Sequence, residues 1–181
     1  DDPQRTHYYA HMANFYGSHP AGVPVIGRLD ALRSVTYQDV LDYHAQRYVP
    51  TNMVFAAVGD FDTEAMLGQV CRAFAPLPAR RASTVVLPEV PPVAGVRRVV
   101  VADPSVQATS ELIGFRTIPL VHPDLYALDV LSYVLTNGES SRLPRTVVRE
   151  RQLATGVSSS SWTPEWGAGE FLFSFRSAPD K

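Results

Sequence analysis

Apolar residues recur with a helical period along much of the chain, and most of the periodic stretches carry a start or stop signal. Residues 4–15 are aromatic-rich and predicted to be helical, and they end at a cluster of Gly, Ser and Pro, which predicts a loop. Thr36 with Asp39 three residues later predicts a helix start, because the two side chains satisfy free backbone N–H groups. Apolar residues follow this start at helical spacing, and the helix is expected to stop before Pro50.

Three further helices are predicted. One begins at Asp62 or Thr63 and carries an apolar stripe made of Met66, Leu67, Val70, Cys71 and Phe74. The second runs from Pro123, a residue tolerated in a first turn, to near Asn137. The last is capped by Ser140 or Ser141 and ends near Gln152.

Short apolar or alternating runs predict strands at 53–58, 97–101, 112–116, 154–161 and 169–175. The run Met53 to Val58 is expected to be buried under the helix that follows it. The last two runs form a hairpin in which Phe171, Phe173 and Phe175 line one face. Because strands occur in adjacent pairs followed by helices, the expected fold class is α+β, with mainly antiparallel sheets and helices packed on one face.

The chain is expected to contain parts of two domains. Five prolines and an arginine pair lie between Pro76 and Pro92, without sustained periodicity. We therefore predict the C-terminal part of a first α+β domain at 1–75, a proline-rich linker at 76–95, and most of a second domain at 96–181.

Composition narrows the function classes. Hydrophobic residues make up 45% of the 181 positions and charged residues 19%, which is typical of a chain that folds. The net charge of −2 and the lack of a basic stripe argue against a nucleic-acid partner. No apolar run approaches the roughly 18 residues of a membrane span. The single cysteine, Cys71, is interpreted as core packing.

Two histidines one helical turn apart, His7 and His11, form the most suggestive metal-binding pattern. The residues between them are Tyr, Tyr and Ala, so the glutamate that zinc peptidases place beside such a pair is missing, and no third ligand can be assigned. We interpret the pair as a surface or half-buried feature of a helix. The other three histidines are also interpreted as structural: His19 in a loop, His44 at the core or its boundary, and His122 before a helix.

Other reactive patterns are weak. The serines 158–161 lack a nucleophile elbow and are interpreted as hydroxyls on a solvent-facing strand, and glycine-rich phosphate loops are absent. Four arginines cluster on the helix after Ser141: Arg142, Arg145, Arg149 and Arg151. A solvated helix face is the usual reason for such a cluster, and the alternative is contact with a substrate carboxylate or carbonyl.

An ordered series of short segments resembles the pitrilysin/insulinase zinc metallopeptidases. In the first half the segments are His19-Pro20, Pro24 to Gly27, Thr36 to Val40, Tyr48 to Met53 and Val58 to Asp62. In the second half they are Leu128 to Leu135, Ser140 to Leu143 and Val148 to Thr155. The resemblance covers nearly the whole chain.

The resemblance implies the LuxS/pitrilysin-like fold, in which tandem α+β domains pair as a clamshell around a peptide. Zinc in this family is held by an H-x-x-E-H helix and a later glutamate. Neither is in this chain, and the family pattern would place the glutamate a few residues before Asp1. The resemblance thus implies zinc in the parent protein, with no cofactor, metal ligand or catalytic residue in this segment.

Members of this family also place an arginine and a tyrosine on the half of the clamshell opposite the zinc, where the two side chains assist the scissile carbonyl as electrophilic donors. Arg149 matches the arginine, but Thr155 stands where the tyrosine is expected. This departure argues against the chain being the half of the clamshell that supplies the pair. It leaves Arg149 as the one weak candidate for substrate binding.

We therefore expect a non-catalytic segment of a zinc metalloendopeptidase, forming chamber wall and domain scaffold. Its partners would be peptide substrates and the other half of the clamshell, in the same chain or in a partner subunit. The alternative is part of a catalytically dead partner or assembly-core subunit of the same family. Likeness to bacterial zinc proteases favours the cell envelope.

Overall fold

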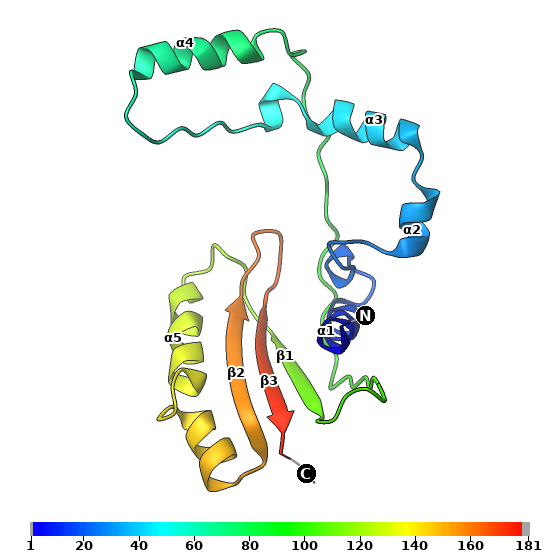
Figure 1. Cartoon of the computed structure of the whole chain (residues 1–181), viewed down its shortest axis with the longest axis vertical. Helices are drawn as coiled ribbons and strands as arrows, with labels where there is room; N and C mark the ends of the chain where they lie inside the picture. Colours follow the sequence, from blue (N-terminus) through cyan, green and yellow to red (C-terminus); the bar gives the residue numbers. More distant parts are fainter. Residues whose placement is uncertain (1, 179–181) are drawn as a thin grey trace. The chain divides into compact units, whose positions relative to one another are not determined.

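Helices and a small antiparallel sheet form in residues 2–178, the part of the chain that the computed structural model describes (Figure 1). They divide into two units. The first unit combines the residues up to Ile26 with those from Leu87 onward, and the second consists of Gly27–Val86. No helix in the described part of the chain is long and apolar enough to cross a membrane.

Helix α1, Pro3–Tyr16, opens the first unit. It begins one residue before the predicted stretch. Pro3 suits a first turn because it lacks the N–H that such a turn leaves free, and the Asp2 carboxylate accepts the N–H of Gln4 at 3.0 Å. Its buried residues are His11, Met12, Phe15 and Tyr16. The 3₁₀ turn η1, Pro20–Gly22, follows directly.

The sheet of the first unit has three antiparallel strands in the order β1-β3-β2. They are β1 Ser110–Arg116, β2 Ala154–Trp162 and β3 Glu170–Ser177. The predicted hairpin is thus confirmed, with Trp162 opposite Glu170 and Val157 opposite Phe175. The α+β class with an antiparallel sheet is confirmed as well.

The two faces of this sheet differ in chemistry, because residues opposite each other on paired strands share a face. One face, called here the helix-covered face, carries Glu111, Ile113, Phe115, Val157, Ser159, Ser161, Phe171, Phe173 and Phe175. The other, called the polar face, carries Ser110, Arg116, Ser158, Ser160, Trp162, Glu170, Ser174 and Arg176, together with Leu112, Gly114 and Leu172. The three phenylalanines of β3 do line one face, as predicted.

Helix α5, Leu125–Thr136, packs along β2 on the helix-covered face (Figure 1). The Thr136 hydroxyl accepts the N–H of Ser159 at 3.0 Å, and the Ser159 hydroxyl donates to the carbonyl of Ser132 at 3.3 Å. These bonds fix the helix to the central part of β2, whereas Ile113 and Phe115 of β1 on the same face stay exposed.

The next helix, η3 Pro144–Glu150, corrects one expectation. It is a π-helix, with the N–H of Arg151 bonded to the carbonyl of Thr146, five residues back. The predicted serine cap does not form, because the Ser141 hydroxyl donates to the carbonyl of Gly138. The helix stops before Gln152, whose φ of 50° cannot continue a right-handed helix.

The second unit contains α2 Leu29–Ser34, α3 Tyr37–Arg47, η2 Pro50–Asn52 and α4 Thr63–Phe74. The predicted starts of two of these helices are confirmed. Thr36 and Asp39 form the reciprocal capping box of α3, and Asp62 caps α4 by accepting the N–H of Ala65 at 2.7 Å. The proline-rich segment is tied to this unit, since the Thr51 hydroxyl donates to the carbonyl of Arg80 at 2.9 Å.

Four expectations about strands and burial are wrong. Residues 53–58 form no strand and are exposed, because no other strand forms within residues 27–86 to pair with them. The stripe of α4 is therefore not buried, and Cys71 is exposed instead of packed in a core. Residues 97–101 also form no strand. The domain division at 76–95 stays a prediction, and its outer ends, residues 1 and 179–181, lie outside the described residues.

Candidate functional site

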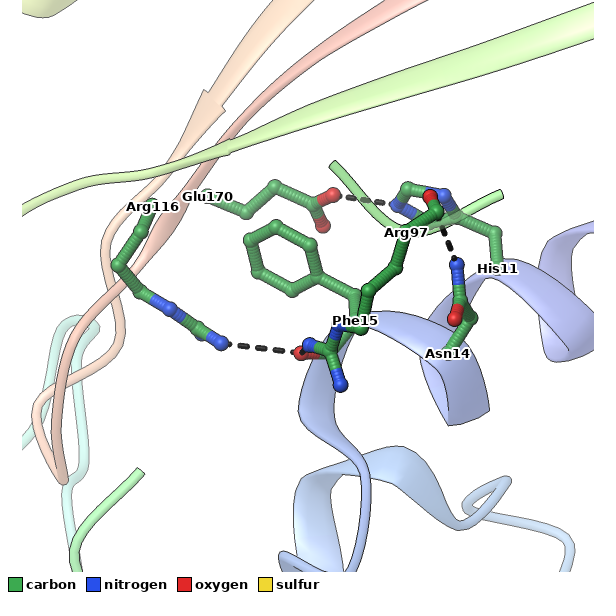
Figure 2. A network of polar contacts seen from close by, with 6 residues as sticks. All are labelled: His11, Asn14, Phe15, Arg97, Arg116 and Glu170. Atoms are coloured by element: carbon green, nitrogen blue, oxygen red, sulfur yellow. Dashed lines mark hydrogen bonds and ion pairs between the residues drawn. The ribbon is translucent and has the colours of Figure 1, made fainter. Parts of the chain in front are cut away.

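A buried polar pair joins α1 to the polar face of the sheet (Figure 2). His11 of α1 bonds through Nε2 to the Glu170 carboxylate at the start of β3. His11 is 7% exposed and Glu170 3% exposed, so water cannot replace either partner. This bond spans 159 residues of sequence and fixes the helix on the sheet.

Gly114 makes the close approach of α1 possible. A Cβ at this position would lie 3.0 Å from Cε1 of His11 and 3.0 Å from Cδ2 of Phe15, and it would also collide with the Glu170 carboxylate. Glycine in the middle of a strand often marks such an approach of another element. The pair of His11 and Glu170 therefore depends on the missing side chain of β1.

Two arginines close the C-terminal end of α1 (Figure 2). Arg97 donates to the carbonyl of Phe15 at 2.8 Å, and Arg116 of β1 donates to the same oxygen at 3.0 Å. The Arg116 guanidinium also lies over the ring of Phe15, 4.1 Å from its centroid, and 4.9 Å from that of Tyr16. Cations at a helix C-terminus are favourable, because the last carbonyls carry partial negative charge. Burial lowers the pKa of Arg116.

Aromatic rings extend the contact beyond the arginines. The fully buried Tyr16 lies 6.0 Å, centroid to centroid, from both Trp162 and Trp166. His19 stacks on Trp166 at 5.0 Å. Burial, followed by the nearby Glu170 charge, raises the pKa of the Tyr16 hydroxyl well above its ordinary value. The cluster therefore stays uncharged at the tyrosine and serves as packing.

A groove of about 1480 Å³ runs beside this contact. Its lining comes from α1, from residues 93–109 and from β1, and it includes His7, His11, Arg97 and Arg116. Within the described residues, no group of three or more His, Cys, Asp and Glu side chains is placed to hold a metal ion. What the arrangement supplies is a hydrogen-bonded pair, a cation over aromatic rings and an open strand edge.

The structure separates the two histidines of the suggestive pattern. His11 is turned into the sheet and engaged with Glu170, whereas His7 lies nearer the surface with its Nδ1 3.0 Å from the hydroxyl of Ser110. Burial and the nearby His11 lower the pKa of His7. The two side chains therefore have different partners, and both partners come from the sheet.

The other histidines have structural environments of different kinds. His19 is buried; its Nδ1 accepts the N–H of Ala21 at 3.1 Å, and its Nε2 lies 3.0 Å from the carbonyl of Pro88. His122 accepts the N–H of Asp124 at 3.1 Å and so acts as a cap before α5. The prediction that His44 lies at the core or its boundary is wrong, because His44 is exposed and stacks on Tyr48 at 4.6 Å.

The four serines of β2 alternate between the two faces of the sheet. Ser158 and Ser160 are exposed on the polar face, as predicted for a solvent-facing strand. Ser159 and Ser161 point to the helix-covered face, where Ser159 is bound to α5. The expectation of a solvent-facing strand is therefore correct for two of the four residues.

Arg149 lies on η3, away from the α1 contact. It pairs with the Glu139 carboxylate, and both side chains are exposed. A shallow pocket of about 310 Å³ is lined by Arg149, by Thr155 and by Val157. The structure thus brings the candidate arginine and the threonine that replaces the expected tyrosine to one small depression.

Sequence reasoning missed Glu170, Arg116 and Phe15. Two signals pointed to the contact, namely the spacing of His11 and Phe15 by one helical turn and the glycine at position 114 inside a strand. Nothing in the sequence marks Glu170 as the partner of His11, because 159 residues separate them.

Comparison with known proteins gives consistent matches. A family model described as the peptidase M16 inactive domain matches residues 34–181. An uncharacterized zinc protease from Mycobacterium leprae is 30% identical over 161 residues, which is 88% of this chain and 36% of that protein. The zinc protease PqqE from Helicobacter pylori is 27% identical over 150 residues, which is 82% of this chain and 34% of that protein.

A solved structure described as a protease from Helicobacter pylori superposes with a TM-score of 0.84. It is 26% identical in sequence, and the match covers 99% of this chain and 44% of that one. The chain therefore spans between a third and a half of the proteins that it resembles.

Proposed function

Because the chain belongs to the peptidase M16 inactive-domain family, we propose that it forms the non-catalytic wall of a peptide-binding chamber in a zinc metalloendopeptidase. Its relatives are named zinc proteases. The hydrolytic zinc would be held by residues outside this chain. His7 and His11 do not fit the metal, since each already has a partner on the sheet and no third ligand is near among residues 2–178.

The difference between the two sheet faces carries this proposal. α5 packs on the helix-covered face along β2, whereas Ser158 and Ser160 of the same strand leave the polar face hydroxylated and exposed. A sheet with one packed and one hydrated face is suited to a wall, because the packed side gives rigidity and the hydrated side meets a polar peptide backbone. α1 covers the polar face along β1, from Ser110 beside His7 to Glu170 beside His11, and Ser158 and Ser160 of β2 stay exposed.

Lysine substitutions on the polar face test the wall. In the intact protein, Ser158→Lys and Ser160→Lys are expected to raise KM for peptide cleavage severalfold, because long charged side chains project from the face that meets substrate. The matched control is Ser140→Lys, an exposed serine in the loop between α5 and η3. Steady-state kinetics on one peptide series measures the effect. An equal rise of KM in all three variants, or no rise for Ser158→Lys and Ser160→Lys, would refute the proposal that the polar face lines the chamber.

Arg149→Ala is expected to leave turnover of the intact protein within about threefold of wild type. The reason is that Arg149 is engaged with Glu139 at the surface and stands beside Thr155, so the pair of groups needed to assist a carbonyl is incomplete. Stability should change by less than about 1 kcal/mol, as for other exposed ion pairs. A loss of kcat by about 100-fold or more would instead make Arg149 a catalytic residue.

A further inference from the structure

The outer edge of β1 faces the groove without a strand partner among the described residues. β1 is an edge strand, since the sheet order is β1-β3-β2. Residues 97–101, two arginines and three valines, run along the other side of the groove and carry exposed side chains. An open edge facing an apolar extended segment is a place where strand pairing is favoured. Four observations define how the two would pair.

The first observation is the turn between them. The N–H of Val106 donates to the carbonyl of Asp103 at 3.1 Å, and the Asp103 carboxylate accepts the N–H of Ser105 at 2.9 Å. Pro104 occupies the position of such a turn that favours proline. A tight turn thus already reverses the chain, with Asp103 opposite Val106.

The second observation is the register that this turn sets. Counting outward two residues at a time, Val101 faces Ala108, Val99 faces Ser110 and Arg97 faces Leu112. Arg98 then lies directly opposite Glu111. These two side chains form an ion pair, with Nη2 3.6 Å from Oε1. The ion pair and the turn therefore indicate the same register between residues 97–101 and β1.

The third observation is the direction of the backbone groups of β1. The N–H of Ser177 bonds to the carbonyl of Thr109 and that of Thr117 to the carbonyl of Gly169, so odd-numbered residues of this strand bond to β3. In an antiparallel ladder the alternate residues point the other way. Ser110 and Leu112 therefore direct their N–H and C=O groups into the groove, as pairing with Val99 and Arg97 requires.

The fourth observation concerns the face on which Arg97 lies. In this register Arg97 shares the polar face with Leu112, and α1 packs on that face. The Arg97 guanidinium already donates to the carbonyl of Phe15 at the end of α1. The carbonyl of Arg97, the oxygen that would accept from Leu112 in this register, instead accepts from the Asn14 amide at 3.4 Å.

We propose that residues 97–101 are a strap that closes onto β1 as a fourth antiparallel strand, with Val99 paired to Ser110 and Arg97 to Leu112. Closure fills the groove and exchanges the Asn14 bond for regular ladder bonds. It also withdraws the β1 edge from other chains, so a peptide adding to this sheet as a strand would have to use the β2 edge.

Residue-resolved hydrogen exchange on the intact protein tests the strap. The amides of Ser110 and Leu112 are expected to exchange as slowly as those of Glu111 and Ile113, which bond to β3. Val99→Pro removes the N–H that would bond to Ser110, so it should speed exchange at Ser110 and Leu112 by about tenfold or more. Val100→Pro is the matched control, because the N–H of Val100 would point away from β1.

Three results would overturn the strap. In the first, Ser110 and Leu112 exchange rapidly in the wild-type protein while Glu111 and Ile113 stay protected. In the second, the two proline variants behave alike. In the third, protection at Ser110 and Leu112 rises with protein concentration, which would assign the β1 edge to a second copy of the chain.

Discussion

His11→Ala is expected to lower the free energy of unfolding by about 3–5 kcal/mol, the cost of leaving a buried charge without its partner. The Glu170 carboxylate is 3% exposed and would lose its bond to Nε2 of His11 without gaining water. Arg116 stays near but is already engaged with the carbonyl of Phe15. Denaturant unfolding of the intact protein, followed by tryptophan fluorescence, measures the change, because Trp162 and Trp166 flank Tyr16 of α1.

His7→Ala is the matched control for this variant. His7 lies one turn earlier on the same helix, is only partly buried and contacts the hydroxyl of Ser110. Its removal should cost no more than about 1 kcal/mol. Replacing both His11 and Glu170 by leucine should cost less than His11→Ala alone, since no charge is then left buried. Equal losses for His7→Ala and His11→Ala would mean that the buried pair does not hold α1.

Gly114→Ala is expected to destabilise the protein by about 1–3 kcal/mol, as overpacking of a tight contact does. The added Cβ would lie 3.0 Å from atoms of both His11 and Phe15, and it would press on the Glu170 carboxylate. α1 would have to move off the polar face to relieve the contact. The unfolding midpoint and the hydrogen exchange of α1 amides report this displacement.

Gly156→Ala provides the comparison on the same sheet. Gly156 lies in β2, and a Cβ there would meet no heavy atom within 4 Å. Alanine at this position should be neutral or stabilising by about 0.5–1 kcal/mol, because glycine loses more backbone freedom on folding. If Gly114→Ala were equally well tolerated, the close packing of α1 on β1 would be wrong.

Local sequence signals predicted the elements that depend on neighbours in sequence. The capping box of Thr36 and Asp39, the Asp62 cap and the hairpin of β2 and β3 need only residues close along the chain, and all three are present. The α+β class followed from the order of these elements. The family resemblance, carried by short ordered segments, is confirmed by the match over residues 34–181.

Expectations that required a distant partner failed. Residues 53–58 have apolar strand composition, but a strand exists only when another strand accepts its hydrogen bonds, and no other strand forms within residues 27–86. Cys71 is exposed for the same reason, since the surface that α4 was expected to cover is not formed within residues 27–86. The bond of His11 to Glu170 arises from topology, and the only sequence signals near it are Gly114 and the spacing of His11 and Phe15.

Photo-crosslinking from the polar face tests the chamber wall most directly. A photoreactive residue placed at Ser160 of the intact protein should capture a peptide substrate, and unlabelled substrate should compete for this product. The same residue placed at Ser140 should capture little. Capture at Ser140 equal to that at Ser160, or no capture at Ser160 in a protein that cleaves the peptide, would contradict the account.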